Sequence, residues 1–155
     1  MLLGIDLGGT KIEGIVLKSK ENPDEIIRHR INTEEEKGYS QVINNIKSLV
    51  NHIENKINYK FKRLGIGTPG TIDPETGLLK NSNSQCLNGM PIQKDLAKTL
   101  DKIIHIQNDA NCFALAETLL GSVKDQYPDA KNVFGIIIGT GVGGGVIIDG
   151  KTVYG

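Results

Sequence analysis

The chain has 155 residues, of which 18 are basic and 18 are acidic, so its formal net charge is zero. This length corresponds to about one domain with a sizeable core. Without an excess of basic side chains we exclude nucleic-acid or membrane binding led by counterion release, and we expect small-molecule or protein partners.

The cysteines and the apolar segments are typical of a cytoplasmic protein. Cys86 and Cys112 are far apart and match neither a disulfide framework nor a zinc-binding spacing. The first residues lack the basic and apolar regions of a signal peptide. The longest nearly apolar stretch, 133–148, is shorter than a membrane span of ~20 residues and is interrupted by glycines.

The chain begins with an apolar strand, expected over Leu2–Asp6, that leads into the turn Gly8-Gly9-Thr10-Lys11. Glycine lets a backbone come close to an oxyanion, while a threonine and a lysine add a hydroxyl and a positive charge. Asp6 would repel a phosphate, so we expect it to face a divalent cation or its water. A second strand over Ile12–Leu17 means that a plain β-hairpin explains the same pattern. Both interpretations stay open from this segment alone.

The following elements alternate between strands and helices. A third strand is expected over Glu25–Ile31. From Tyr39 onward, apolar residues at 42, 43, 46, 49, 50, 53 and 57 have the period of a long amphipathic helix. A short buried strand over Arg63–Thr68 ends at Pro69-Gly70, and Pro91 suits the first turn of a helix.

The last elements are a strand over Ile103–Ile106, a helix over Asn108–Leu120, and two strands over Val133–Ile138 and Val142–Ile148. The alternation predicts an α/β layer fold, with a mixed sheet covered by helices.

A second glycine turn, 139–145, contains five glycines in seven positions. It satisfies GxGxxG, but the dinucleotide fingerprint also needs a helix after the turn, and here a strand follows. Two glycine turns between strands could grip a polyphosphate from two sides. Two ordinary hairpins are the alternative, and we favour phosphate binding because the glycines exceed what a hairpin needs.

Polar side chains follow the strand at Ile103–Ile106. Asn108, Asp109 and Asn111 stand where a helix begins, and asparagine and aspartate are preferred helix caps. Capping needs only one of them. A carboxylate at a helix N-terminus could accept a proton from an alcohol that attacks phosphorus. Amides and hydroxyls also crowd the loop Lys80–Gly89, as recognition of a polyhydroxy ligand requires.

Together these segments resemble one family, the ROK sugar kinases. The resemblance is carried by LGIDLGGTKIE, LGIGTPGTIDPETG, NSNSQCLNGMPIQKDL, IQNDANCFALAE and IIIGTGVGGGVI, in the family's order and over nearly the whole chain. It implies the ribonuclease-H-like α/β domain of the actin and Hsp70-like ATPases, with a mixed sheet flanked by helices. It also implies transfer of the γ-phosphoryl group of ATP to a hydroxyl of a hexose or N-acetylhexosamine.

The resemblance assigns roles to individual residues. The two phosphate loops are matched by Asp6, Gly8, Gly9, Thr10 and Lys11, and by Gly139, Thr140 and Gly141. The sugar site is matched by Pro69, Gly70, Asn83, Asn108 and Asp109, with Asp109 as the general base. ATP and Mg²⁺ are the implied cofactors, and Asp6 is the implied magnesium ligand, acting through water.

Members of this family are about twice as long. Beyond the matched segments they carry a Gly-Glu-x-Gly-His sugar motif, a cysteine-rich zinc motif and an adenosine pocket, none of which occurs in residues 1–155. We therefore expect 1–155 to be the N-terminal lobe of a two-lobed kinase, inactive by itself, with the C-terminal lobe and any structural Zn²⁺ site absent from this chain. For the full-length protein the resemblance also admits a homodimer.

Two questions stay open. The first is whether the protein is an enzyme, because the same family includes sugar-sensing transcriptional regulators without kinase activity. These regulators carry a helix-turn-helix before the first phosphate loop and often lose the key residues of that loop. Here the first strand begins at Leu2 and the loop is intact. The acceptor sugar is the second question. The loop Lys80–Gly89 is most similar to fructokinases and NDANCFALAE to N-acetylglucosamine kinases, with glucose and mannose as further candidates. A non-sugar ATPase is disfavoured by the asparagine-rich loop.

Overall fold

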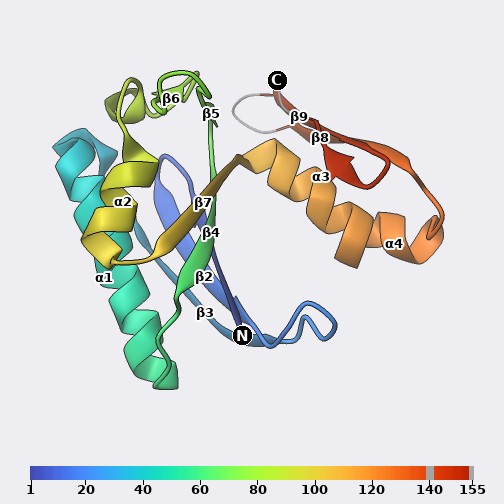
Figure 1. Ribbon diagram of the computed structural model, residues 1–155, viewed down its shortest axis with the longest axis horizontal. Helices are drawn as coiled ribbons and strands as arrows, with labels where there is room; N and C mark the ends of the chain where they lie inside the picture. The colour runs from blue at the N-terminus through green and yellow to red at the C-terminus, as the bar shows by residue number, and fades with distance from the viewer. Residues whose placement is uncertain (139–141, 154–155) are drawn as a thin grey trace. The chain divides into compact units, whose positions relative to one another are not determined.

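The structure is a computed structural model that describes residues 1–138 and 142–153 (Figure 1). It divides into two compact units, Met1–Gln107 and Asn108–Gly155. Each unit has its own sheet and its own helices, so each is described by itself.

The first unit is built on a mixed five-stranded sheet. Its strands are β1 (Leu2–Leu7), β2 (Lys11–Leu17), β3 (Glu25–Asn32), β4 (Arg63–Thr68) and β7 (Ile103–Asn108), in the order β3-β2-β1-β4-β7. The pairs β1 with β2 and β2 with β3 are antiparallel, whereas β1 pairs with β4 in parallel. Apolar side chains alternate along β1 and β2, which is why one face of these strands is buried.

Helix α1 (Tyr39–Ile57) covers that face and lies beside α2 (Ile92–Leu100) (Figure 1). Its buried side chains follow the predicted helical stripe: Val42, Ile43, Ile46, Leu49, Val50 and Ile53. The helix approaches β2 closely at Gly14, where an added Cβ would lie 2.5 Å from Cδ1 of Ile53. Most residues of the first unit's hydrophobic core lie on α1 or on the strands of this sheet.

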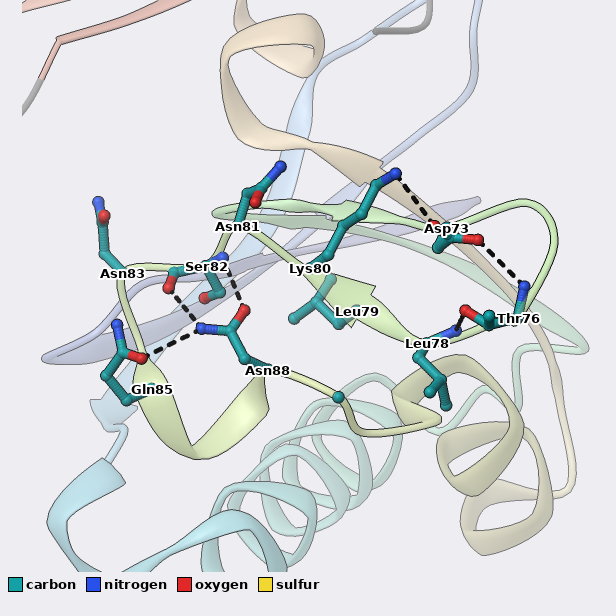
Figure 2. Close-up of a pocket in the computed structure, with 11 residues that line it drawn as sticks. Asp73, Thr76, Leu78, Leu79, Lys80, Asn81, Ser82, Asn83, Gln85 and Asn88 are labelled. Atoms are coloured by element: carbon teal, nitrogen blue, oxygen red, sulfur yellow. Dashed lines mark hydrogen bonds and ion pairs between the residues drawn. The ribbon is translucent and has the colours of Figure 1, made fainter.

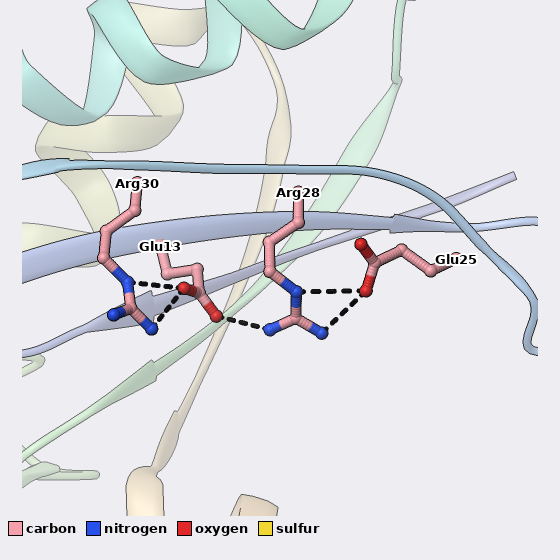
Figure 3. Close-up of polar contacts among 4 residues, drawn as sticks. All are labelled: Glu13, Glu25, Arg28 and Arg30. Atoms are coloured by element: carbon pink, nitrogen blue, oxygen red, sulfur yellow. Dashed lines mark hydrogen bonds and ion pairs between the residues drawn. The ribbon is translucent and has the colours of Figure 1, made fainter.

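The opposite face of β2 and β3 carries charged side chains instead. Glu13 forms ion pairs with Arg28 and Arg30, both at 2.5 Å, and Arg28 forms a further ion pair with Glu25 at 2.8 Å (Figure 3). Burial alone would raise the pKa of Glu13, but the hydrogen bonds from both arginines lower it. Because the arginines are exposed, these ion pairs contribute little to stability.

A buried carboxylate joins the end of α1 to the segments around it. Glu54 is 2% exposed and accepts hydrogen bonds from Lys102 Nζ at 2.8 Å, Lys60 Nζ at 3.0 Å and the Phe61 N–H at 2.8 Å. Lys102 also donates to the Phe61 carbonyl at 2.7 Å. The carboxylate therefore ties α1 to the start of β4 and to the turn before β7.

Short elements connect these strands and helices. They are η1 (Glu35–Lys37), the two-stranded hairpin of β5 (Thr71–Ile72) and β6 (Leu79–Lys80), and η2 (Gln85–Leu87).

The second unit contains α3 (Asp109–Leu120), α4 (Ser122–Gln126) and an antiparallel sheet of β8 (Asn132–Ile138), β9 (Val142–Ile148) and β10 (Lys151–Thr152). Helix α3 packs on β8 and β9 through small residues. An added Cβ on Gly145 would lie 2.3 Å from the Ala110 carbonyl oxygen, and one on Gly135 would lie 2.9 Å from the Ala114 Cβ. Packing therefore accounts for part of the glycine density that we attributed to phosphate binding.

Substituting Gly145 by alanine should destabilise the protein. The new methyl group would meet backbone atoms of α3, which cannot rotate away, so we expect a loss of about 2 kcal/mol or more in the free energy of unfolding, measured by urea denaturation. Gly65→Ala in β4 is the matched control, because its Cβ would meet nothing within 4 Å. Equal stabilities of the two variants would contradict this packing.

The predicted order of strands and helices is confirmed, with strand ends that differ by one or two residues. β7 extends through Asn108 rather than ending at Ile106, and the sequence did not predict β5, β6, α4 or β10. Among the helices of the described residues, none is both long and apolar enough to cross a membrane.

Candidate active site

The first glycine turn, Gly8–Lys11, joins β1 to β2 and is called the phosphate loop below. Its ends are closed by a hydrogen bond from the Gly8 N–H to the Lys11 carbonyl at 3.0 Å. Buried Thr33, just after β3, donates its hydroxyl to the Gly8 carbonyl at 2.6 Å and its N–H to the Thr10 carbonyl at 3.0 Å. The loop therefore has a fixed backbone.

Charged groups of both signs flank the phosphate loop. Asp6 lies near the end of β1, opposite Glu13 on β2 and Gly67 on β4, and its side chain is exposed. The Lys11 ammonium group donates to the side-chain oxygen of Asn32 on β3. A lysine held by a neutral amide keeps its positive charge available to an anion.

Sequence reasoning missed Glu35, which also lies at this loop. Its carboxylate oxygens would be 3.5 Å from a Cβ on Gly9. In the part of the chain that the structure describes, Glu35 Oε2 is the buried side-chain oxygen that has no hydrogen-bond partner. Burial raises the pKa of the nearby Cys86 thiol, and the negative charge of Glu35 raises it further. Only the folded chain brings Glu35 to Gly9.

Three of the residues predicted to bind sugar, Pro69, Gly70 and Asn83, lie on two loops of the first unit. The turn at Pro69-Gly70 follows β4, and the second loop, 80–89, is called the acceptor loop below. Gly70 has φ +88°, and a Cβ there would lie 2.4 Å from the Lys80 carbonyl oxygen and 2.9 Å from the Ser82 nitrogen. Only glycine fits this contact, which presses the turn against the acceptor loop.

The acceptor loop is held in shape by its own side chains. Asn88 accepts from the Ser82 N–H and donates to the Ser82 carbonyl, both at 2.9 Å (Figure 2). The side chain of Asn83 points away from this network, and Asn83 is one of the eleven residues that line a cavity of about 610 Å³. At the other end of the cavity, Asp73 accepts from the Thr76 N–H and pairs with Lys80, which lowers the pKa of Asp73 to about 2.

The phosphate loop and the acceptor loop lie side by side, because a Cβ on Gly9 would be 3.4 Å from Ser84 Oγ. The structure thus brings together the first of the two predicted phosphate loops and one predicted sugar-binding segment within the first unit.

Asn108 and Asp109 begin the second unit. The Asn108 side-chain oxygen accepts from the N–H groups of Ala110 at 3.1 Å and Asn111 at 3.3 Å, so Asn108 is the N-cap of α3. Asp109 is the first residue of α3, partly exposed, and its Oδ1 accepts from the Ala110 N–H at 2.8 Å. The helix N-terminus stabilises the negative charge of this carboxylate.

The second predicted phosphate loop, Gly139, Thr140 and Gly141, lies outside the described residues. Of the glycines that follow it, Gly143 and Gly145 face Ala110 of α3.

Comparison with known proteins gives a consistent set of relatives. A family described as the ROK family matches residues 2–155. An N-acetyl-D-glucosamine kinase from Aliivibrio salmonicida is 39% identical over 155 residues, 100% of this chain and 49% of that protein. One from Haemophilus influenzae is 37% identical over 151 residues, 97% of this chain and 47% of that protein.

Among solved structures, the ROK hexokinase from Thermus thermophilus superposes with a TM-score of 0.82 and 28% identity, over 99% of this chain and 49% of the hexokinase. The α/β fold with its mixed five-stranded sheet is therefore the fold of one half of that enzyme. The chain spans about half the length of the relatives it matches.

Proposed function

Because this chain belongs to the ROK family, we propose that the protein containing it transfers the γ-phosphoryl group of ATP to a sugar hydroxyl. The observation that carries the proposal is the short distance between Gly9 and Ser84, since a Cβ on Gly9 would lie 3.4 Å from Ser84 Oγ; it places a loop suited to phosphate beside a loop suited to a polyhydroxy ligand. Phosphoryl transfer needs donor and acceptor held next to each other.

The phosphate loop fits the β- and γ-phosphates of ATP. Glycines allow a backbone to come close to an anion, and Lys11 supplies a positive charge that Asn32 does not neutralise. The exposed carboxylate of Asp6 suits Mg²⁺ bound through water. When bound, Mg²⁺ would neutralise charge that develops on the phosphate oxygens.

The acceptor that we propose to test first is N-acetylglucosamine, because the two relatives named above are N-acetyl-D-glucosamine kinases. We propose that Asn83 and Asn108 bind sugar hydroxyls, with Gly70 shaping the loop that carries Asn83. An amide can donate and accept at once, as a hydroxyl requires.

We propose that Asp109 is the general base. Its carboxylate would take the proton of the attacking sugar hydroxyl while that oxygen forms its bond to the γ-phosphorus and the bond to the β-phosphate oxygen breaks, leaving ADP. A carboxylate becomes a competent base as the attacking oxygen loses basicity along the reaction. The remaining oxygen of Asp109 is available for this, since the Ala110 N–H is bonded to Oδ1.

We further propose that residues 1–155 are one lobe of a two-lobed enzyme that works in the cytoplasm. The face of β8 and β9 that is turned away from α3 is apolar and exposed: Ile138 is 80% exposed and Val142 opposite it 79%. Phe134 and Ile136 extend the same face. An exposed apolar surface of this kind normally contacts another protein surface. We propose that the remaining half of the protein packs against it. We propose that any structural Zn²⁺ site lies in the remaining half of the protein.

The decisive experiment is a coupled ADP-release assay of the full-length protein with N-acetylglucosamine, N-acetylmannosamine, glucose, mannose and fructose. We expect the highest kcat/KM with N-acetylglucosamine and no turnover when Mg²⁺ is chelated. A higher kcat/KM for another sugar would show that the proposed acceptor is wrong, while the proposed phosphoryl transfer would still hold. Absence of ATP-dependent turnover with every sugar, together with specific DNA binding, would identify a transcriptional regulator instead.

A further inference from the structure

The end of β3 holds the phosphate loop by its backbone. We infer that Thr33 is a positioning residue for nucleotide binding, which fixes the direction in which the loop presents its N–H groups; this inference rests on the proposed function. Its hydroxyl donates to the Gly8 carbonyl at 2.6 Å, and its own N–H donates to the Thr10 carbonyl at 3.0 Å. Both bonds end on the turn that we assign to the phosphates of ATP.

The geometry of the peptide bond relates the direction of the Gly8 carbonyl to that of the Gly9 N–H. In a trans peptide the C=O and the following N–H point opposite ways. Because the Gly8 carbonyl points at Thr33, the Gly9 N–H points away from Thr33. No residue in the described ranges 1–138 and 142–153 accepts a hydrogen bond from that N–H. It is a donor that a phosphate oxygen can use.

Thr33 is itself held firmly. Its side chain and backbone are 1% exposed, so water does not compete for the hydroxyl. The side-chain amide of Asn45 on α1 donates to the Thr33 carbonyl at 3.0 Å. Helix α1 therefore holds Thr33 in place, and Thr33 in turn holds the phosphate loop. A binding group that is supported in this way loses little entropy when its ligand arrives.

The residue before Thr33 orients the charge of the same site. Asn32 accepts a hydrogen bond from Lys11 Nζ with its amide oxygen. An ammonium group has three N–H donors, so two remain for phosphate oxygens. Because the amide is neutral, it directs the ammonium group without cancelling its charge.

The test is Thr33→Val in the full-length protein, because valine keeps the shape of threonine and the backbone N–H but removes the hydroxyl donor. We expect the KM for ATP and the Kd for MgADP, measured by calorimetry, to rise about five- to tenfold, the factor for one lost hydrogen bond. The KM for the sugar should stay within twofold. Thr33→Ser, which restores the hydroxyl, should bring the KM for ATP back to within about twofold of the wild type.

Thr118→Val is the matched control. The Thr118 hydroxyl also donates to a backbone carbonyl, that of Ala114 at 2.7 Å, but within α3. We expect this control to lose stability without changing the KM for ATP. If Thr33→Val changes only the thermal stability, or raises both KM values equally, Thr33 is structural and the inference is wrong.

Asn32→Asp tests the same segment by placing a negative charge next to Lys11. An aspartate would pair with Lys11 and should raise the Kd for MgADP at low salt, with a smaller effect at high salt, because salt screens exposed charges. An unchanged Kd would contradict the role of Asn32. A wild-type protein that phosphorylates no sugar would refute the proposed function, whereas the Kd values for MgADP would still test Thr33 and Asn32.

Discussion

Replacing Asp109 by asparagine is expected to lower kcat for sugar phosphorylation by about three orders of magnitude, the range that a general base supplies. Asparagine has the same shape, and its side-chain oxygen can still accept the bond from the Ala110 N–H that Asp109 Oδ1 accepts. Helix α3 should therefore begin at the same place. The variant loses only the capacity to take a proton.

The measurements are kcat by the coupled assay and the Kd of the sugar by calorimetry, both on the full-length protein. The Kd should change by less than about threefold, because an amide can still bind a hydroxyl. Asp125→Asn in α4 is the control, since Asp125 is an exposed aspartate of the same unit, and it should leave kcat unchanged. If Asp109→Asn keeps kcat within tenfold of the wild type, Asp109 is not the base.

The second large effect concerns stability and is expected at Glu54. Replacing Glu54 by glutamine would leave the Lys102 ammonium group, 9% exposed, without its charged partner. Removing one member of a buried ion pair typically costs about 3 to 5 kcal/mol. Glutamine keeps one acceptor oxygen for the Phe61 N–H, so we expect about 3 kcal/mol from urea denaturation with an unchanged m value. Lys60→Met is the control. The Lys60 side chain is 69% exposed, and its loss should cost less than about 1 kcal/mol.

The Glu54 carboxylate also makes the free energy of unfolding depend on pH. Burial would raise the pKa of Glu54, but the hydrogen bonds from Lys102, the Phe61 N–H and Lys60 outweigh it and lower the pKa below its usual 4.5. A group with a lowered pKa stabilises the fold above its unfolded value and loses this effect as the pH falls through the folded value. The stability difference between wild type and Glu54→Gln should therefore shrink below pH 4.5. A difference that stays constant from pH 7 to pH 3 would contradict the assignment.

The main elements could be predicted because their signals are local. The helical stripe from Val42 to Ile53 and the alternation along β2 each arise from one element burying one face. The rejection of a dinucleotide fingerprint at Gly139–Gly144 depended on a strand, not a helix, following the turn, and β9 confirms that strand. The small elements β5, β6 and β10 were missed because two residues are too few to show a period.

The functional assignments depended on different kinds of information. The likeness to a family located Asp6–Lys11, Gly70 and Asn83 through their order in the chain, and the structure places the loops that contain Gly9 and Asn83 beside each other. The roles of Asn108 and Asp109 as sugar ligand and base stay predictions.

The sequence by itself determined the elements, the α/β class and the segments where phosphate and sugar chemistry is expected, because hydrophobic periodicity and glycine turns are properties of neighbouring residues. Only the tertiary structure decided which distant groups support those segments. Thr33 reaches the Gly8 carbonyl, and Glu35 reaches Gly9, because β3 pairs with β2 and ends beside the turn. It also showed that Gly145 is small so that α3 can approach β9. Contacts of this kind depend on strand pairing and helix packing, which bring together residues far apart in the chain, and no local pattern records them.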